Sequence, residues 1–284
     1  MKIRAGYKLS FECMAPMPII LKLSVHPDRR PDLITPDALR LSVAAPFRQI
    51  QDEFGNLATR VKAPAGHITF SSEFVIQDSG APDLQNPNAR QVAVADLPDE
   101  ALPFLLASRY CESDQLSDLA WSLFGWTTPG WGRVQSIVDY VHDRIAFGYQ
   151  HARSTRTAAQ GHAERVGVCR DFAHLAVALC RAMSIPARYC TGYLGDIGVP
   201  VSDAPMDFSA WFEVYLEGGW YTFDARHNEP RIGRIVIARG RDAADVAITH
   251  TFGSAWLTNF TVITDELTHD QAEGEGASRM IAAE

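Results

Sequence analysis

Cys169 is the residue of this sequence best placed to act as a nucleophile. It is the third residue of the segment GVCRDFAHLAVALCRAMSIPARY, residues 167–189, where apolar residues recur with the spacing of one buried helical face. The predicted helix must end near Ser184, because Ile185 precedes a proline. Cys169 therefore falls in the first turn, where unpaired N–H groups and the helix dipole favour a thiolate and can bind an oxyanion.

The alternative interpretation of Cys169 is a buried structural cysteine, which is the commoner state of a free cysteine. Two features argue against it: the residue is followed by Arg170 and Asp171, and it lies off the apolar stripe. Cys180 lies on that stripe and is the expected structural cysteine of the helix. We expect Arg170 and Asp171 to brace the start of the helix and not to react.

A cysteine nucleophile needs a base to take its proton and a third group to orient that base. After the helix the apolar period changes to two, and residues 208–224 form a predicted hairpin with its turn at Gly218-Gly219. In that register Glu213 faces Asp224, which ends the second strand. Asp224 is thus a candidate orienting group, although a lone aspartate at a strand end is more often a turn residue.

These segments resemble the core of the transglutaminase-like superfamily of bacterial cysteine proteases. The resemblance rests on GVCRDFAHLAVALCRAMSIPARYCTGYLG and, after it, DFSAWFEVYLEGGWYTFDARHN. It spans roughly residues 100–264, and the β-rich start of the chain resembles the N-terminal domain of bacterial members. It implies a papain-like α+β core in which a Cys-His-Asp triad acts on an amide carbonyl. Cys169 matches the nucleophile, and Asp224 matches the aspartate of the triad.

The middle member of the triad does not match. The family has His-Ala-Trp on the strand before the hairpin, and this chain has Ser209-Ala210-Trp211. A serine cannot serve as a general base near neutral pH. His227 is the best candidate replacement among the histidines, because it follows Asp224 by three residues at the end of the sheet where the imidazole is missing. The alternative is a loop histidine that binds backbone.

Three further residues are candidate substrate contacts. Ser209 and Trp211 share a predicted strand face, and Tyr149 precedes the helix. Trp211 and Tyr149 could form the cleft wall or donate to an oxyanion, but aromatic residues at such positions are more often core residues. His174, about 140° around the helix from Cys169, is expected to face away from it.

Composition describes an ordinary globular chain of 284 residues, 46% hydrophobic and 21% charged, with a formal net charge of −8. The negative charge argues against nucleic acid or an anionic membrane as partner. The apolar run Met17–Leu21 is too short to span a bilayer, and no signal-peptide pattern opens the chain. The five cysteines form no CxxC pair, so we expect no metal, no cofactor and a reduced cytoplasmic protein.

The predicted fold class is α+β, with a small antiparallel sandwich or open barrel ahead of the transglutaminase-like core. The predicted parts are a β-rich N-terminal domain at 1–78, a linker at 79–98, a catalytic domain at 99–265 and a flexible tail at 266–284. Helices are predicted near residues 102–110, 117–124 and 134–145, and a hairpin turn at 54–56.

The predicted function is thiol-dependent acyl transfer on a peptide or isopeptide amide of a peptide or protein substrate. Hydrolysis is favoured over protein cross-linking, because water is always present and nothing in the sequence resembles a site for a second amine substrate. The rival hypothesis is a pseudoenzyme that binds peptides and lacks the base, which Ser209 supports. A degenerate assembly subunit is a third possibility, and the oligomeric state stays open.

Overall fold

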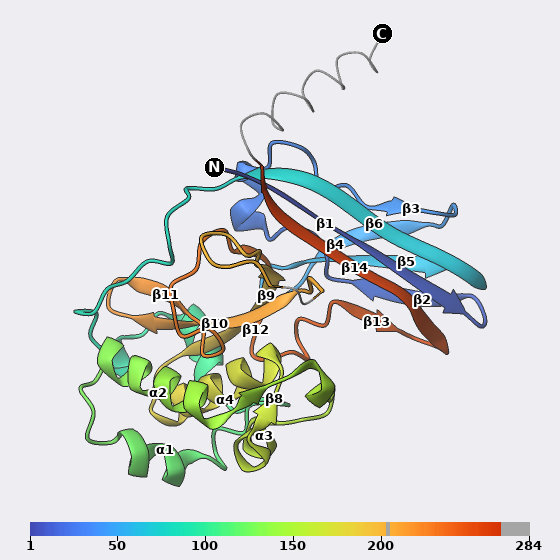
Figure 1. Cartoon of the computed structure of the whole chain (residues 1–284). Helices are drawn as coiled ribbons and strands as arrows, with labels where there is room; N and C mark the ends of the chain where they lie inside the picture. The colour runs from blue at the N-terminus through green and yellow to red at the C-terminus, as the bar shows by residue number, and fades with distance from the viewer. Residues whose placement is uncertain (203–204, 268–284) are drawn as a thin grey trace.

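The computed structural model of the chain describes residues 1–202 and 205–267, and it contains two β-sandwich sheets above a mixed helix-and-sheet unit (Figure 1). The strands are β1 (Lys2–Cys13), β2 (Met17–Leu21), β3 (Arg40–Leu41), β4 (Phe47–Gln51), β5 (Leu57–Ala63), β6 (Gly66–Gln77), β7 (Ala146–Phe147), β8 (Val166–Gly167), β9 (Ala187–Tyr193), β10 (Ser209–Leu216), β11 (Gly219–Phe223), β12 (Ile235–Gly240), β13 (Thr249–Thr251) and β14 (Ala255–Leu267). The α-helices are α1 (Ser117–Phe124), α2 (Trp131–Arg144), α3 (Ala158–Glu164) and α4 (Cys169–Ala182). Short 3₁₀ helices are η1 (Pro27–Asp32), η2 (Val94–Asp96), η3 (Asp99–Leu105) and η4 (Tyr149–His151).

The sandwich consists of two four-stranded sheets with the orders β14-β1-β6-β3 and β13-β2-β5-β4. Alternate residues of β1, from Ile3 to Cys13, are buried between the sheets, as the period of a half-buried strand requires. All strand pairs within the sandwich are antiparallel. The predicted α+β class and the antiparallel sandwich are confirmed, and β4 and β5 form the hairpin expected around residues 54–56.

The last strands of the chain return to the sandwich. β13 pairs with β2, and β14 pairs along its whole length with β1 (Figure 1). The sequence placed residues 99–265 in one catalytic unit, but residues 249–267 lie in the sheets of the N-terminal part. The alternation of residues 256–264 indicates a strand without indicating its partner. Of the tail expected at 266–284, the first two residues belong to β14, and 268–284 lie outside the described residues.

The second unit packs α4 against the sheet β11-β10-β9-β12. Residues 171–181 of α4 are all buried, so the helix is covered on every side and not along one stripe alone. The helix ends at Ala182, and Ser184 takes a left-handed conformation with φ 59° before the proline, close to the predicted end. The helix predicted near 102–110 is instead η3, which contains Pro103 and cannot continue as an α-helix.

The hairpin of β10 and β11 turns one residue earlier than the glycine pair predicts. Gly219 already belongs to the ladder, so the turn consists of residues 217–218. Glu213 therefore lies opposite Thr222, and the expected pairing with Asp224 is wrong. The alternation is preserved, because the pairing shifts by two residues and not by one.

The two units share one apolar core. Buried residues of the sandwich, such as Ile3 and Phe74, pack in the same cluster as Ala173 of α4 and Tyr193 of β9. The rings of Phe74 and Tyr193 meet edge to face with centroids 5.6 Å apart. Residues 79–98, expected as a linker, are held at several points, for example by two bonds from the Arg234 guanidinium to the carboxylate of Asp83. No helix among residues 1–202 and 205–267 has the length and apolar character needed to cross a membrane.

Candidate active site

Cys169 is the first residue of α4 and follows Val168, whose backbone is extended. Among the five cysteines, all of which lie in the described part of the chain, Cys169 is partly exposed and the other four are buried. Cys180 is fully buried on α4, as expected for the structural cysteine. The sulfur of Cys169 is thus the cysteine sulfur best placed to meet a dissolved molecule.

Asp171 fixes the start of α4. Its carboxylate accepts a hydrogen bond of 2.9 Å from the backbone N–H of Val168, which caps the first turn. The same oxygen accepts a 2.9 Å bond from Arg156, and both side chains are buried. Arg170 Nη2 lies 3.5 Å from the other carboxylate oxygen. The predicted bracing role of these two residues is therefore present, and Arg156 completes it.

Asp224 and His227 form a hydrogen-bonded pair after β11. The N–H of Asn228 bonds to the backbone oxygen of Asp224, and the N–H groups of Arg226 and His227 bond to its Oδ1. This tight turn reverses the chain and brings His227 Nδ1 to 2.9 Å from Asp224 Oδ2. Strand alternation would place His227 on the opposite face, and the turn removes that constraint.

Arg234 holds Asp224 in its ionised form. Burial alone would raise the pKa of the Asp224 carboxyl, but Arg234 and His227 outweigh burial and hold this pKa well below its usual range. Arg234 Nη2 lies 3.0 Å from Asp224 Oδ2. Because an ionised carboxylate only accepts, Nδ1 of His227 carries the proton of their shared bond, and Nε2 is left free to take one.

A surface hollow of about 70 Å³ brings the candidate residues together. Its lining includes Cys169, His227, Ser209 and Tyr149, so four of the six sequence-predicted site residues meet there. Asp224 does not line the hollow; it is buried and reaches the site through its bond to His227. The other described residues in its lining are Leu194, Asp196, Ser202, Pro205, Met206, Asp207, Phe208, Arg226 and Arg231.

The Cys169 thiol is protonated at neutral pH. Burial raises the pKa of this thiol to about 11, and Asp207 acts in the same direction. Arg226 and the backbone N–H of Ala210 act against the rise but do not cancel it. The sequence predicted a lowered pKa from the helix N-terminus, which is wrong for the free protein because the loss of water around the sulfur outweighs the groups that favour the thiolate. A base is therefore needed to generate the nucleophile.

Trp211 does not form the wall of this hollow. Its side chain is 2% exposed and lies beside Cys190 and Val236, and the guanidinium of Arg234 stands 5.0 Å from its ring centre. The proposed substrate contact is thus wrong for Trp211, because its strand face carries it toward the Arg234 that supports Asp224. Tyr149 is 43% exposed at the rim, with its ring edge to face against Phe147.

Ser209 lies at the position where the resemblance to the transglutaminase-like family implies a histidine. The residue begins β10, is 6% exposed and lines the hollow. Its Oγ is buried and makes no hydrogen bond to any described residue. His174 is fully buried, stacked on Tyr110, and accepts a 3.1 Å bond from the backbone N–H of Ala243, so it faces away from the hollow as expected.

Three residues of the site escaped the sequence analysis. Arg226 lines the hollow, stabilises a thiolate at Cys169 and stands 3.8 Å above the ring of Phe147. Asp207 lines the hollow from the start of β10, and Arg234 supports Asp224 from ten residues further along. Arg226 stands two residues after Asp224, and this proximity in the sequence could have identified it. Nothing in the sequence around Arg234 indicates its contact with Asp224.

Within the described residues no group of three or more His, Cys, Asp and Glu side chains is arranged to hold a metal ion.

Comparison with known proteins places this site in a family. Residues 118–225 match the model of the transglutaminase-like superfamily core. A solved structure from Cytophaga hutchinsonii, provisionally named a cysteine protease, is similar with a TM-score of 0.82 and 32% identity, covering 95% of this chain and 92% of that one. An uncharacterized protein of Mycobacterium tuberculosis strain H37Rv is 28% identical over 219 residues, which is 69% of this chain and 68% of the relative. The chain belongs to the transglutaminase-like superfamily, in agreement with the resemblance seen in its sequence.

Proposed function

We propose that this protein is a cysteine peptidase or amidase that hydrolyses peptide or isopeptide amides. The observation that carries the proposal is the 2.9 Å bond between His227 and Asp224 at a hollow that His227 shares with Cys169. In this proposal Cys169 is the nucleophile, His227 is the base in place of the family histidine, and Asp224 orients it. The provisional name of the Cytophaga hutchinsonii protein supports the same reaction class.

The reaction balances with these three side chains and water. His227 Nε2 takes the thiol proton while the sulfur of Cys169 attacks the amide carbonyl carbon. The N–H groups at the start of α4 stabilise the oxyanion. The C–N bond breaks as the proton passes from His227 to the leaving amine. Water, deprotonated by His227, then attacks the thioester, which releases a carboxylic acid and restores the thiol.

The test uses p-nitrophenyl acetate, a small activated ester that acylates thiols, and a casein digestion assay. Wild-type protein should release a burst of one equivalent of nitrophenol, and Cys169→Ser should lose the burst. His227→Ala should slow acylation by about 10²–10⁴-fold, the range expected for loss of a general base. Asp224→Asn should reduce turnover by about 10⁴-fold, because an amide misorients the imidazole.

A histidine that lines no part of the hollow provides the control. His151→Ala should acylate like the wild type, because His151 lies in η4 and its ring bonds to Gln150. If His227→Ala acylates at the wild-type rate and Ser209→His raises that rate, His227 does not serve as the base. The proposal would then be overturned in favour of a peptide-binding pseudoenzyme.

A further inference from the structure

We propose that β14 supplies an apolar subsite beside Cys169 that receives an apolar side chain of the peptide substrate. The subsite consists of Phe260 and Leu257 of β14 together with Phe208, which precedes β10. The inference rests on the proposed function and names the class of substrate for that site. It assigns part of the substrate contact to the sandwich and not to the papain-like unit, which is the second unit, with α4 packed against the sheet β11-β10-β9-β12.

The subsite is continuous with the hollow. Phe208 lines the hollow and is 8% exposed, so most of its ring is already covered. The ring of Phe260 meets the ring of Phe208 edge to face, with centroids 5.9 Å apart. Phe260 itself is 40% exposed. A substrate whose carbonyl lies over Cys169 therefore has an open aromatic surface within reach at the Phe208 wall.

The register of β14 extends this surface along one face of the strand. Phe260 pairs with Leu9 of β1, and Leu257 pairs with Phe11, two positions away on the same face. The bulge between Ser10 and Phe11 keeps the two side chains on that face in spite of their spacing of three residues. Leu257 is 51% exposed. The two side chains thus form neighbouring parts of one uncovered apolar strip.

The site has two ends, the hollow at Cys169 and the subsite on β14, and their chemistry indicates how a peptide substrate would lie between them. At the Cys169 end, Arg226 and Asp207 offer charged groups that suit the polar main chain around an amide. At the β14 end, the three subsite side chains are apolar and offer no hydrogen bond. An apolar substrate side chain buries surface there, whereas a carboxylate would lose water without gaining a partner. The site is therefore expected to prefer peptides with an aromatic or aliphatic residue near the cleaved amide.

The test uses tripeptidyl acyloxymethyl ketones in which one position at a time is Phe or Glu and the others are Gly. The Cys169 sulfur displaces the acyloxy group, so an S–C bond forms, a carboxylate leaves and the thiol proton passes to His227. Mass spectrometry of Cys169 gives the rate. At one position we expect Phe to react at least tenfold faster than Glu. Phe260→Ala should reduce that preference about tenfold, and Phe260→Lys should reverse it.

Trp256→Ala is the matched control, because Trp256 is an exposed aromatic residue of the same strand that pairs with Glu12 and points to the other face. It should keep the wild-type preference and react with iodoacetamide at the wild-type rate. Equal rates for Phe and Glu at all positions, or a preference unchanged by both Phe260 variants, would overturn the subsite alone. Failure of Cys169 to react with any peptide probe, while iodoacetamide still labels it, would overturn the proposed function and the subsite with it.

Discussion

At the scale of residues, the proposed nucleophile is a thiol that carries its proton in the free protein. With a pKa of about 11, Cys169 is almost entirely protonated at neutral pH. His227 Nδ1 is bonded to Asp224, and in the proposed reaction its Nε2 takes the thiol proton. Arg226 lowers the cost of charging the sulfur from the rim of the hollow.

The pH dependence of alkylation follows from this assignment. Iodoacetamide reacts with thiolates, so below the pKa the rate at Cys169 should rise about tenfold for each pH unit and level off near pH 11. Arg226→Gln should move the curve to higher pH, because it removes a positive charge that favours the thiolate. Arg48→Gln, an exposed change on β4, should leave the curve unchanged. A rate that already levels off near pH 7 would contradict the assignment and indicate a resting ion pair.

Two of the three proposed catalytic residues could be found from sequence because they stand in recognisable motifs. Cys169 opens a helix and Asp224 closes a hairpin, and His227 was found by proximity to Asp224 alone. Trp211 was misplaced, because alternation puts Ser209 and Trp211 on one face of β10 but does not tell that the hollow meets that face at Ser209 and not at Trp211. Arg234 was missed, since ten irregular residues separate it from the carboxylate it supports.

At the scale of elements, the first turn of α4 is built around a buried ion pair. Asp171 binds the N–H of Val168 and the guanidinium of Arg156 through the same oxygen. Sequence analysis could predict the helix and the bracing residue, because both are local. It could not predict Arg156, which reaches the turn from the segment between η4 and α3. The hairpin register was mispredicted for a related reason. A turn at residues 217–218 and a turn at residues 218–219 both contain glycine, so both satisfy the local turn chemistry.

Replacing Asp171 should therefore destabilise the folded protein more than the loss of a helix cap usually does. Asp171→Ala removes the cap of α4 and leaves the buried Arg156 guanidinium with Glu164 as its carboxylate partner, so we expect it to lower the free energy of unfolding by about 2–4 kcal/mol in urea titrations. Asp118→Ala changes an exposed acidic residue in the first turn of α1 and should cost about 1 kcal/mol or less. Equal losses for the two variants would show that the buried pair does not stabilise α4.

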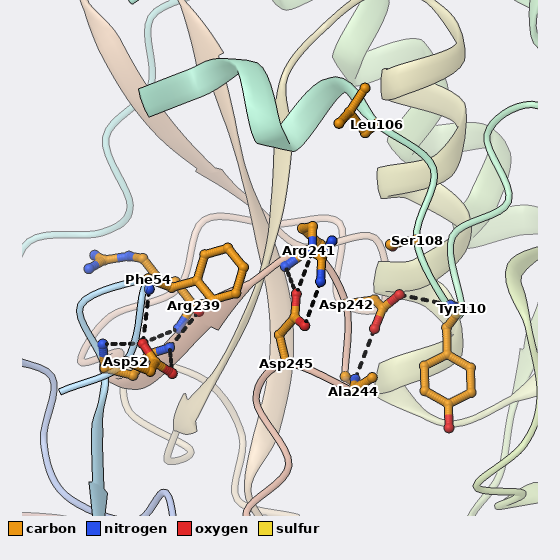
Figure 2. A network of polar contacts seen from close by, with 12 residues as sticks. Asp52, Phe54, Leu106, Ser108, Tyr110, Arg239, Arg241, Asp242, Ala244 and Asp245 are labelled. Atoms are coloured by element: carbon orange, nitrogen blue, oxygen red, sulfur yellow. Dashed lines mark hydrogen bonds and ion pairs between the residues drawn. The ribbon is translucent and has the colours of Figure 1, made fainter. Parts of the chain in front are cut away.

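At the scale of the molecule, the sandwich and the papain-like unit are joined by polar contacts as well as by a shared apolar core. Besides the shared core, the loop after β4 binds the end of β12: Asn56, fully buried, donates to the backbone oxygen of Arg239 and accepts from its N–H, at 2.7 and 2.8 Å. Asp52 holds Asn56 in place, and Lys22 lies between Asp52 and the backbone of Asp245. Figure 2 shows two further sets of contacts nearby: Arg241 pairs with Asp245, and the Asp242 carboxylate accepts a bond from the backbone N–H of Tyr110. Such contacts join distant segments and leave no periodic signal in the sequence.

If the two units unfold together, a destabilising substitution in the sandwich must also lower the stability of the papain-like unit. Trp256 of β14 is one of six tryptophans, and the other five lie between residues 121 and 220. In a Trp256→Phe background, fluorescence therefore reports the papain-like unit. Asn56→Ala leaves two buried backbone groups of Arg239 unpaired, so it should lower the fluorescence-detected stability by about 2–4 kcal/mol.

Asn259→Ala is the control, because the amide of Asn259 binds only within the sandwich. It should cost about 1 kcal/mol or less. A fluorescence midpoint unchanged by Asn56→Ala, while circular dichroism shows an earlier loss of strand signal, would mean that the sandwich unfolds alone and that the contact between Asn56 and Arg239 does not couple the two units.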